Sequence, residues 1–168
     1  MLTLVIGGAA SGKSAYAEAL LLRSDAKTRV YLATMEPRGA AARIARHREM
    51  RANKGFVTVE RLTDISGVTL PPSSAVLLED LGNLCANELF LPQGGGMDAV
   101  VRGVARLRAS CRDLVIVSNE VFTGGADYGE GTARYLSALA TLHRALAREA
   151  EIVCEVCGGV ACCYKGAL

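Results

Sequence analysis

The sequence lacks a long apolar run, a large net charge and a signal-like start. None of its apolar stretches approaches the ~20 residues of a membrane span, and its formal net charge is only +2. A charge that small does not by itself indicate a nucleic-acid or membrane partner. The first residues enter an apolar stretch directly, with no basic region followed by a signal core. We therefore expect a cytoplasmic protein with no membrane partner and no nucleic-acid partner.

The sequence also has little histidine, which bears on the meaning of its six cysteines. Cys154, Cys157, Cys162 and Cys163 form a cluster that could hold zinc or act in redox chemistry. No histidine lies nearby, and the spacing is not that of a standard zinc ribbon. The alternative is a late core strand over residues 151–158, in which cysteine packs as a small apolar side chain. The second interpretation is favoured, and a disulfide is not expected in a reducing cytosol.

Composition and length indicate a folded, one-domain protein. Apolar residues make up 51% of the chain and charged residues 21%, proportions typical of a globule rather than a disordered chain. A chain of 168 residues can bury a sizeable single core. We expect one domain over residues 1–168.

The strongest motif is a glycine-rich loop near the N-terminus. Its residues fit the pattern GxxxxGK(S/T) and are Gly7, Gly8, Ala9, Ala10, Ser11, Gly12, Lys13 and Ser14. An apolar run precedes the loop and a helix-prone run follows it, so free N–H groups at a helix N-terminus would face a phosphate. Lys13 would act catalytically on the β/γ-phosphates, and the hydroxyl of Ser14 would hold Mg²⁺. The loop therefore predicts a nucleoside-triphosphate site.

Strand-like and helix-like segments alternate along the rest of the chain. The patterns predict strands over 2–6, 29–34, 56–60, 75–78, 114–117 and 151–158, and helices over 15–23, 38–51, 81–90, 97–111 and 132–150. We expect the last strand to be followed only by a short tail. Such alternation is typical of an α/β fold with a mostly parallel central sheet and helices on both faces. With the glycine-rich loop, it predicts a P-loop NTPase-like fold.

Polar residues end several of the predicted strands. They are Thr34, Glu79, Asp80, Asn119 and Glu120. Since the carboxyl ends of parallel strands meet at one edge, we expect these residues to gather beside the phosphate loop. Glu79 follows an apolar strand as the Mg²⁺-supporting acid of many NTPases does; the alternative is a strand end capped by solvated acids. A glycine-rich segment over 122–131 is long enough to act as a lid.

A basic segment carries a lone histidine. Arg43, His47 and Arg51 are spaced to share one face of a helix. Arginines could hold phosphate oxygens while a neutral imidazole attacks phosphorus. The positive surroundings would lower the pKa of the ring and favour its neutral form. The alternative from the residues alone is an exposed basic helix with an incidental histidine.

Taken together, the motifs resemble one enzyme family. The ordered stretches GGAASGKS, YLAT, RIARHR, FVTVE, LLED and VSNEV, between residues 2 and 121, are similar to the adenosylcobinamide kinase/adenosylcobinamide-phosphate guanylyltransferase family. The resemblance implies two reactions. ATP or GTP phosphorylates the hydroxyl of the aminopropanol arm of adenosylcobinamide, and GTP then transfers GMP to adenosylcobinamide phosphate through a GMP–histidine intermediate.

The resemblance also assigns residues and partners. His47 matches the family's nucleophile, and a trimer, hence a homo-oligomer, is implied. The positions implied to contact the nucleotide are Thr34, Met35, Glu36, Arg48, Glu49, Met50, Arg51, Glu60 and Glu79. Together with the residues' own chemistry, this assigns Mg²⁺ to Ser14 and Glu79. Two other classes stay open: another small-molecule P-loop kinase, and a non-catalytic nucleotide-binding regulator.

The sequence departs from the family pattern at several positions. Ala10 replaces an arginine inside the loop, Phe56 a tryptophan and Gly82 a threonine. The segments 38–42 and 122–127 and the pair His143–Arg144 also differ. Most of these departures lie away from the phosphate loop and from His47, so they bear on corrinoid recognition more than on nucleotide binding.

Overall fold

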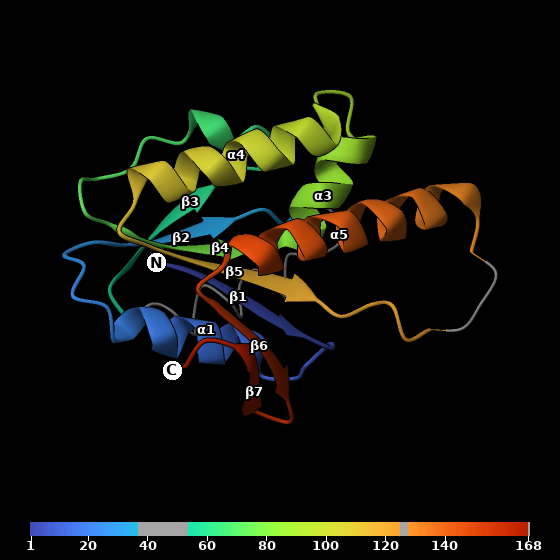
Figure 1. Ribbon diagram of the computed structural model, residues 1–168. Helices are drawn as coiled ribbons and strands as arrows, with labels where there is room; N and C mark the ends of the chain where they lie inside the picture. Colours follow the sequence, from blue (N-terminus) through green and yellow to red (C-terminus); the bar gives the residue numbers. More distant parts are fainter. Residues whose placement is uncertain (37–53, 125–127, 168) are drawn as a thin grey trace.

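Strands and helices alternate through the structure, a computed structural model that describes residues 1–36, 54–124 and 128–167 (Figure 1). The strands are β1 (Leu2–Gly7), β2 (Arg29–Ala33), β3 (Phe56–Glu60), β4 (Ala75–Glu79), β5 (Asp113–Asn119), β6 (Ile152–Cys157) and β7 (Val160–Lys165). The helices are α1 (Lys13–Leu22), α3 (Leu81–Phe90), α4 (Gly96–Ser110) and α5 (Glu130–Glu149), with a 3₁₀ turn, η1, over Ile65–Gly67. The predicted helix over 38–51 lies outside the described residues.

The strands form one seven-stranded sheet in the order β3-β2-β4-β5-β1-β6-β7. Neighbouring strands are parallel throughout, except that β7 runs antiparallel to β6. β1, β4 and β5 are runs of Val, Leu and Ile that are buried on both faces of the sheet, as parallel strands usually are. The expected α/β fold with a mostly parallel sheet is confirmed.

Helices cover both faces of the sheet, as expected (Figure 1). On one face, α1 packs through Ala17 and Leu21 against Val5 and Val117. On the other face, α3, α4 and α5 bury residues such as Leu84 together with side chains of the central strands. In α5 the buried stripe consists of Leu139, Leu142 and Leu146, while Leu136 is only partly buried. None of the described helices is long and apolar enough to cross a membrane.

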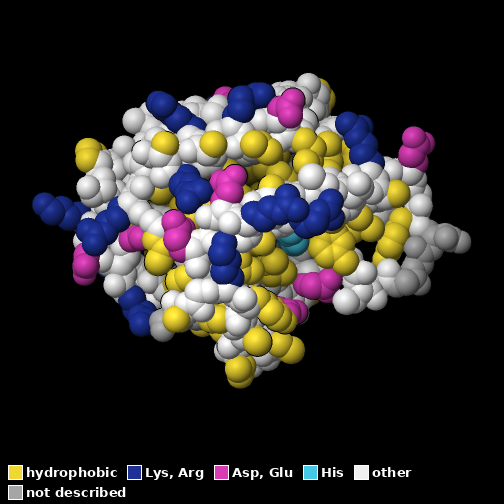
Figure 2. Space-filling model, viewed as in Figure 1, with side chains coloured by type: hydrophobic (Ala, Val, Ile, Leu, Met, Phe, Trp, Pro, Cys, Tyr) yellow, Lys and Arg dark blue, Asp and Glu magenta, His cyan; other side chains and the backbone are white. Residues whose placement is uncertain are grey.

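The end of the chain differs from the expected tail, because residues 160–165 form the strand β7. Gly158 and Gly159 both have positive φ, 57° and 81°, which suits the tight two-residue turn of a hairpin. The segment was missed because Val-Ala-Cys-Cys-Tyr-Lys does not alternate between apolar and polar residues. Figure 2 shows hydrophobic side chains gathered on this hairpin, where Val160 and Tyr164 are exposed.

The cysteine cluster is divided between the core and the surface. Cys154 is buried in β6, as the packing interpretation requires. Cys157, Cys162 and Cys163 are exposed, so for these three residues the packing interpretation is wrong. Within the described part of the chain, no group of three or more Cys, His, Asp or Glu side chains is placed to hold a metal ion.

The packing of α4 on η1 yields a stability prediction. A Cβ at Gly103 would lie 2.3 Å from Cγ1 of the fully buried Ile65, so Gly103→Ala should destabilise the fold by about 1–3 kcal/mol through overpacking. Gly131→Ala in α5 is the matched control, because among the described residues no atom beyond its chain neighbours and its own helix backbone lies within 4 Å of the added methyl group. It should stabilise the fold by about 0.5 kcal/mol. Urea denaturation measures both, and changes of the same sign would contradict the packing described here.

Candidate nucleotide-binding site

The phosphate loop connects the end of β1 to the start of α1, as predicted. A Cβ at Gly7 would lie 2.6 Å from the carbonyl oxygen of Val156, so only glycine fits between β1 and β6. Gly12 caps α1 with a φ of 92°, a conformation that glycine adopts without steric cost. Ala10 also has a positive φ, 57°, which is uncommon for a residue with a Cβ. The loop therefore has a defined shape that its glycines permit.

The hairpin at the end of the chain supports this loop. The N–H of Gly159 donates to the carbonyl oxygen of Ser11 at 2.8 Å. A Cβ at Gly12 would lie 3.1 Å from Cα of Gly159, so the two backbones are in close contact. The turn between β6 and β7 thus packs directly against the phosphate loop.

The side chain of Lys13 folds back over the first residues of the phosphate loop. It is buried, and Nζ donates to the carbonyl oxygen of Gly8 at 3.0 Å. Gly8 itself has open space where a Cβ would stand. The ammonium group is therefore held at the mouth of the loop, where a bound phosphate would lie.

Ser14 joins the phosphate loop to the end of β4. Its hydroxyl donates to Oε1 of Glu79 at 2.6 Å, and Glu79 is 5% exposed. Burial is the main cause that raises the pKa of Glu79 to about 7, against the lowering effect of the Ser14 hydrogen bond. Oε2 of Glu79 has no hydrogen-bond partner among the described residues. A carboxylate oxygen without a partner beside a serine hydroxyl is a donor set that fits Mg²⁺.

Thr34 and Asp80 hold the end of β4 in place. The hydroxyl of Thr34 donates to the carbonyl oxygen of Asp80 at 2.8 Å and accepts its N–H at 3.0 Å. Thr34 is fully buried, so its side chain braces the site rather than lining an open surface. The carboxylate of Asp80 caps α3 by accepting the N–H of Asn83 at 2.6 Å. It also accepts from Nδ2 of Asn119 at 3.4 Å.

The expected gathering of polar strand ends beside the loop is confirmed for these residues. Thr34 follows β2, Glu79 ends β4 and Asp80 follows it, and Asn119 ends β5. Glu120 also lies beside the loop, since its N–H donates to the carbonyl oxygen of Gly7 at 3.0 Å. Its carboxylate turns away, to the N–H of Phe122 and the hydroxyl of Thr123.

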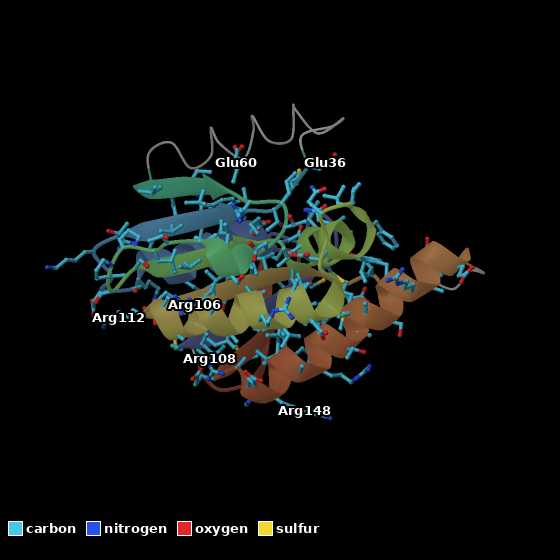
Figure 3. The ribbon with its side chains drawn as sticks, turned by 90° about the horizontal axis from the view of Figure 1, so that it is seen from above. Glu36, Glu60, Arg106, Arg108, Arg112 and Arg148 are labelled. Carbon is cyan, nitrogen blue, oxygen red and sulfur yellow. The ribbon has the colours of Figure 1, made fainter. Side chains whose placement is uncertain are left out.

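The other predicted contacts are spread along the same edge of the sheet. Met35 and Glu36 follow β2 and are partly buried, and Glu60 is exposed at the end of β3. Figure 3 shows Glu36 and Glu60 on the β2–β3 side, away from the arginines of α4. His47, Arg43, Arg48, Glu49, Met50 and Arg51 lie outside the described residues, so their roles stay predictions.

Asn87 belongs to the support of the site and was missed in the sequence. Its Nδ2 donates to the carbonyl oxygen of Thr34 at 2.7 Å and to that of Leu62 at 2.9 Å. Asn87 thereby joins α3 to the segments that follow β2 and β3. The available signal was an amide residue in the mixed stretch LGNLCANELF, which also contains Asn83 and Glu88, because a buried amide needs hydrogen-bond partners.

A partly buried histidine, His143, supports β5 from the side of α5. Nε2 of His143 lies 2.7 Å from Oγ of Ser118, the residue before Asn119. The ring of Phe122 packs edge-on against the imidazole with centroids 5.5 Å apart. Burial lowers the pKa of His143 to about 4, so the ring is neutral at neutral pH and acts here as packing and as a hydrogen-bond partner.

Comparisons with known proteins agree with this geometry. The sequence model of the family "Cobinamide kinase / cobinamide phosphate guanyltransferase" matches residues 3–163. The chain is 32% identical over 180 residues to the bifunctional adenosylcobalamin biosynthesis protein CobU of Escherichia coli (strain K12), covering 95% of this chain and 97% of that protein. It is 31% identical to the protein of the same name from Salmonella typhimurium, with the same coverage. It is also 31% identical over 175 residues to the bifunctional adenosylcobalamin biosynthesis protein CobP of Pseudomonas aeruginosa, covering 99% of this chain and 98% of that protein.

The neutral His143 predicts a pH dependence of stability. Because the pKa of this group falls from about 6.5 in the unfolded chain to about 4 in the folded one, the unfolded state binds the extra proton as the pH drops. The stabilisation is complete above pH 6.5 and is lost as the pH falls toward 4. At pH 5 the loss should be about 2 kcal/mol.

Comparing the protein with His143→Gln isolates this effect, since glutamine can keep a hydrogen bond to Ser118 without titrating. The free energy of unfolding should fall more steeply between pH 7 and pH 5 in the protein than in the variant. Other groups, Glu79 included, titrate in both chains and cancel in the difference. Parallel pH profiles would show that His143 is charged or unburied in the folded state.

Proposed function

Because the chain belongs to the cobinamide kinase / cobinamide phosphate guanyltransferase family, we propose that it phosphorylates adenosylcobinamide and then transfers GMP from GTP to the product, adenosylcobinamide phosphate. The observation that carries the proposal is the buried contact between Ser14 of the phosphate loop and Glu79 of β4. This contact brings a hydroxyl and a carboxyl group together, and the proposal is that the triphosphate and its metal ion bind beside them.

In the kinase step, the loop binds and orients the triphosphate of ATP or GTP. The N–H groups at the start of α1 and the ammonium of Lys13 offset the charge of the phosphate oxygens. The acceptor hydroxyl attacks the γ-phosphorus, the bond to the β-γ bridging oxygen breaks, the nucleoside diphosphate leaves, and the hydroxyl proton passes to the solvent. Ser14 and Glu79 would hold Mg²⁺, which neutralises charge on the phosphates.

In the guanylyl step, a nitrogen of His47 attacks the α-phosphorus of GTP and pyrophosphate leaves. A phosphate oxygen of adenosylcobinamide phosphate then attacks the same phosphorus, and the bond to His47 breaks. The basic residues of the segment, Arg48 and Arg51 among them, would neutralise the triphosphate. Met35, Glu36 and Glu60, at the ends of β2 and β3, would contact the nucleotide. A homo-oligomer, a cytoplasmic location and the absence of a nucleic-acid partner stay predictions from the sequence.

Labelling with GTP tests the covalent step. Incubation with α-labelled GTP and Mg²⁺ should give an acid-labile, base-stable protein adduct that is lost in His47→Ala. The chain has two histidines, so His143→Gln is the matched control and should retain the adduct. Lys13→Ala should abolish phosphate transfer to cobinamide, because it removes a positive charge from the phosphate site.

Each alternative predicts another outcome of the same experiment. An adduct that survives in His47→Ala would contradict the role of His47. Phosphate transfer without any adduct would leave a small-molecule kinase. Nucleotide binding without either reaction would indicate a non-catalytic regulator.

The raised pKa of Glu79 predicts proton release when the metal and nucleotide bind. Because burial raises the pKa of Glu79 to about 7, the free protein holds this proton up to neutral pH, and a bound Mg²⁺ would displace it. At pH 7 about half a proton should be released per site, and Mg²⁺–nucleotide affinity should rise with pH up to about 7 and then level off.

Calorimetry in buffers of different ionisation enthalpy measures the number of protons released. Glu79→Gln is the control, since glutamine can still accept the hydrogen bond from Ser14 but carries no titrating proton. The nucleotide's own phosphate titration is common to both proteins and cancels in the comparison. Equal proton release from the protein and the variant would show that Glu79 does not bind the metal ion.

A further inference from the structure

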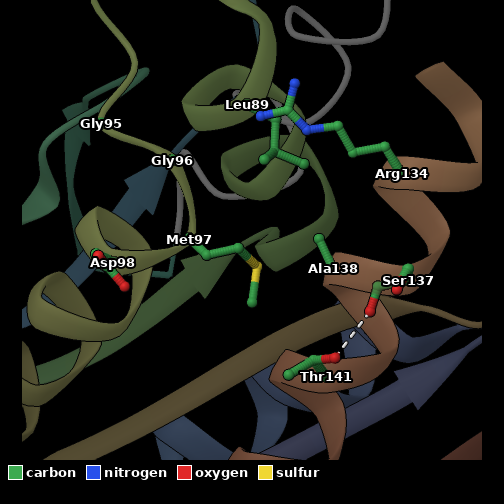
Figure 4. Close-up of a pocket in the computed structure, with 9 residues that line it drawn as sticks. All are labelled: Leu89, Gly95, Gly96, Met97, Asp98, Arg134, Ser137, Ala138 and Thr141. Carbon is green, nitrogen blue, oxygen red and sulfur yellow. Dashed lines mark hydrogen bonds between the residues drawn. The ribbon is translucent and has the colours of Figure 1, made fainter.

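A hollow lies on the face of the sheet that carries α3, α4 and α5 (Figure 4). Its volume is about 530 Å³, and its lining includes Leu89, Met97, Asp98, Arg134, Ser137 and Ala138. These residues come from the end of α3, the first turn of α4 and one stripe of α5. The pocket thus lies at the junction of the three helices.

The pocket stays open because glycines form part of its wall. A Cβ at Gly94 would lie 2.2 Å from the carbonyl oxygen of Glu88, so only glycine fits at this position. The buried carboxylate of Glu88 accepts the N–H of Gly95 at 2.7 Å and that of Asp64 at 2.6 Å. Three consecutive glycines have the composition of a flexible connection, but the hydrogen bond from Gly95 to Glu88 fixes this segment. Gly95 and Gly96 then line the pocket without filling it.

The pocket and the phosphate loop are connected through α3. The first residues of this helix are held by Asp80, next to Glu79, whereas its last turn supplies Leu89 to the pocket. Eight residues of helix separate Leu81 from Leu89, or about 12 Å along the axis. On the opposite wall, the hydroxyl of Tyr135 in α5 would lie 2.9 Å from a Cβ at Gly82. Both walls therefore extend from the pocket toward the site.

The lining suits a ligand that has an apolar body and amides on its rim. Leu89, Met97 and Ala138 supply apolar surface (Figure 4). Arg134 can only donate hydrogen bonds, and an ionised Asp98 can only accept them. Among the described residues neither forms an ion pair, and both are exposed. A primary amide offers a carbonyl oxygen to Arg134 and N–H groups to Asp98.

We propose that this pocket binds the amide-bearing edge of the corrin ring of the acceptor, so that the aminopropanol arm extends along α3 to the phosphate loop. The inference rests on the proposed function, because the acceptor is the corrinoid of that reaction. An arm of about seven bonds spans roughly 8 Å when extended, about two-thirds of the roughly 12 Å of α3 between Leu81 and Leu89, so the edge of the ring has to project from the pocket toward Glu79. Met97 adds a flexible apolar contact for the ring.

Two variants of the pocket test this assignment. Ala138→Trp fills the hollow and should raise the KM for adenosylcobinamide at least tenfold and weaken cobinamide binding in equilibrium dialysis by a similar factor. Arg134→Ala, an exposed change that leaves the core intact, should raise the same KM several-fold. In both variants the KM for GTP and the yield of the GMP–protein adduct should be unchanged, because the phosphate loop is untouched.

The matched controls are Ala145→Trp and Arg148→Ala, which introduce the same changes at exposed positions of α5 outside the pocket. They should leave the KM for the corrinoid unchanged. If the protein turns over adenosylcobinamide and neither pocket variant alters its KM, the assignment of the pocket is wrong although the proposed function stands. If the protein itself neither binds nor phosphorylates the corrinoid, the proposed function fails, and the pocket proposal fails with it.

Discussion

The contact between Ser14 and Glu79 is the interaction on which the arrangement of the site depends. It joins the phosphate loop, which follows β1, to the end of β4, two strands away in the sheet. Glu79 can occupy this buried position because Thr34 and Asp80 hold the backbone at the end of β4. The cost of burying a carboxyl group appears as its raised pKa. That same cost makes Glu79 a strong ligand for a cation once it ionises.

Local patterns were enough to predict the phosphate loop and most of the sheet. The bounds of α3 agree with the prediction, since Asp80 is an N-cap residue before an apolar run and Pro92 follows the end. β1, β4 and β5 were recognisable because parallel strands buried on both faces are continuous apolar runs. The gathering of polar strand ends followed from the parallel topology. In each case the information lies within a few neighbouring residues.

The parts that the sequence did not reveal depend on contacts between distant segments. The role of Asn87 cannot be predicted from its helix alone, because its hydrogen-bond partners are backbone carbonyl groups in the segments that follow β2 and β3. Gly94–Gly96 has the composition of a flexible linker, and only the carboxylate of Glu88 turns it into a fixed wall. The exposed cysteines of the last hairpin have the composition of a core strand, but among the described residues β7 is exposed along most of its length.

The support that Gly159 gives to Ser11 links the beginning of the chain to its end. β1 also lies between β5 and β6, so the first strand to be synthesised has its partners only in the last third of the sequence. In a growing chain, the residues of the phosphate loop are therefore synthesised long before the strands that give the loop its conformation. The loop reaches this conformation only after β5, β6 and the turn at Gly159 have been made, so a nucleotide in the site indicates that the β6–β7 hairpin has folded.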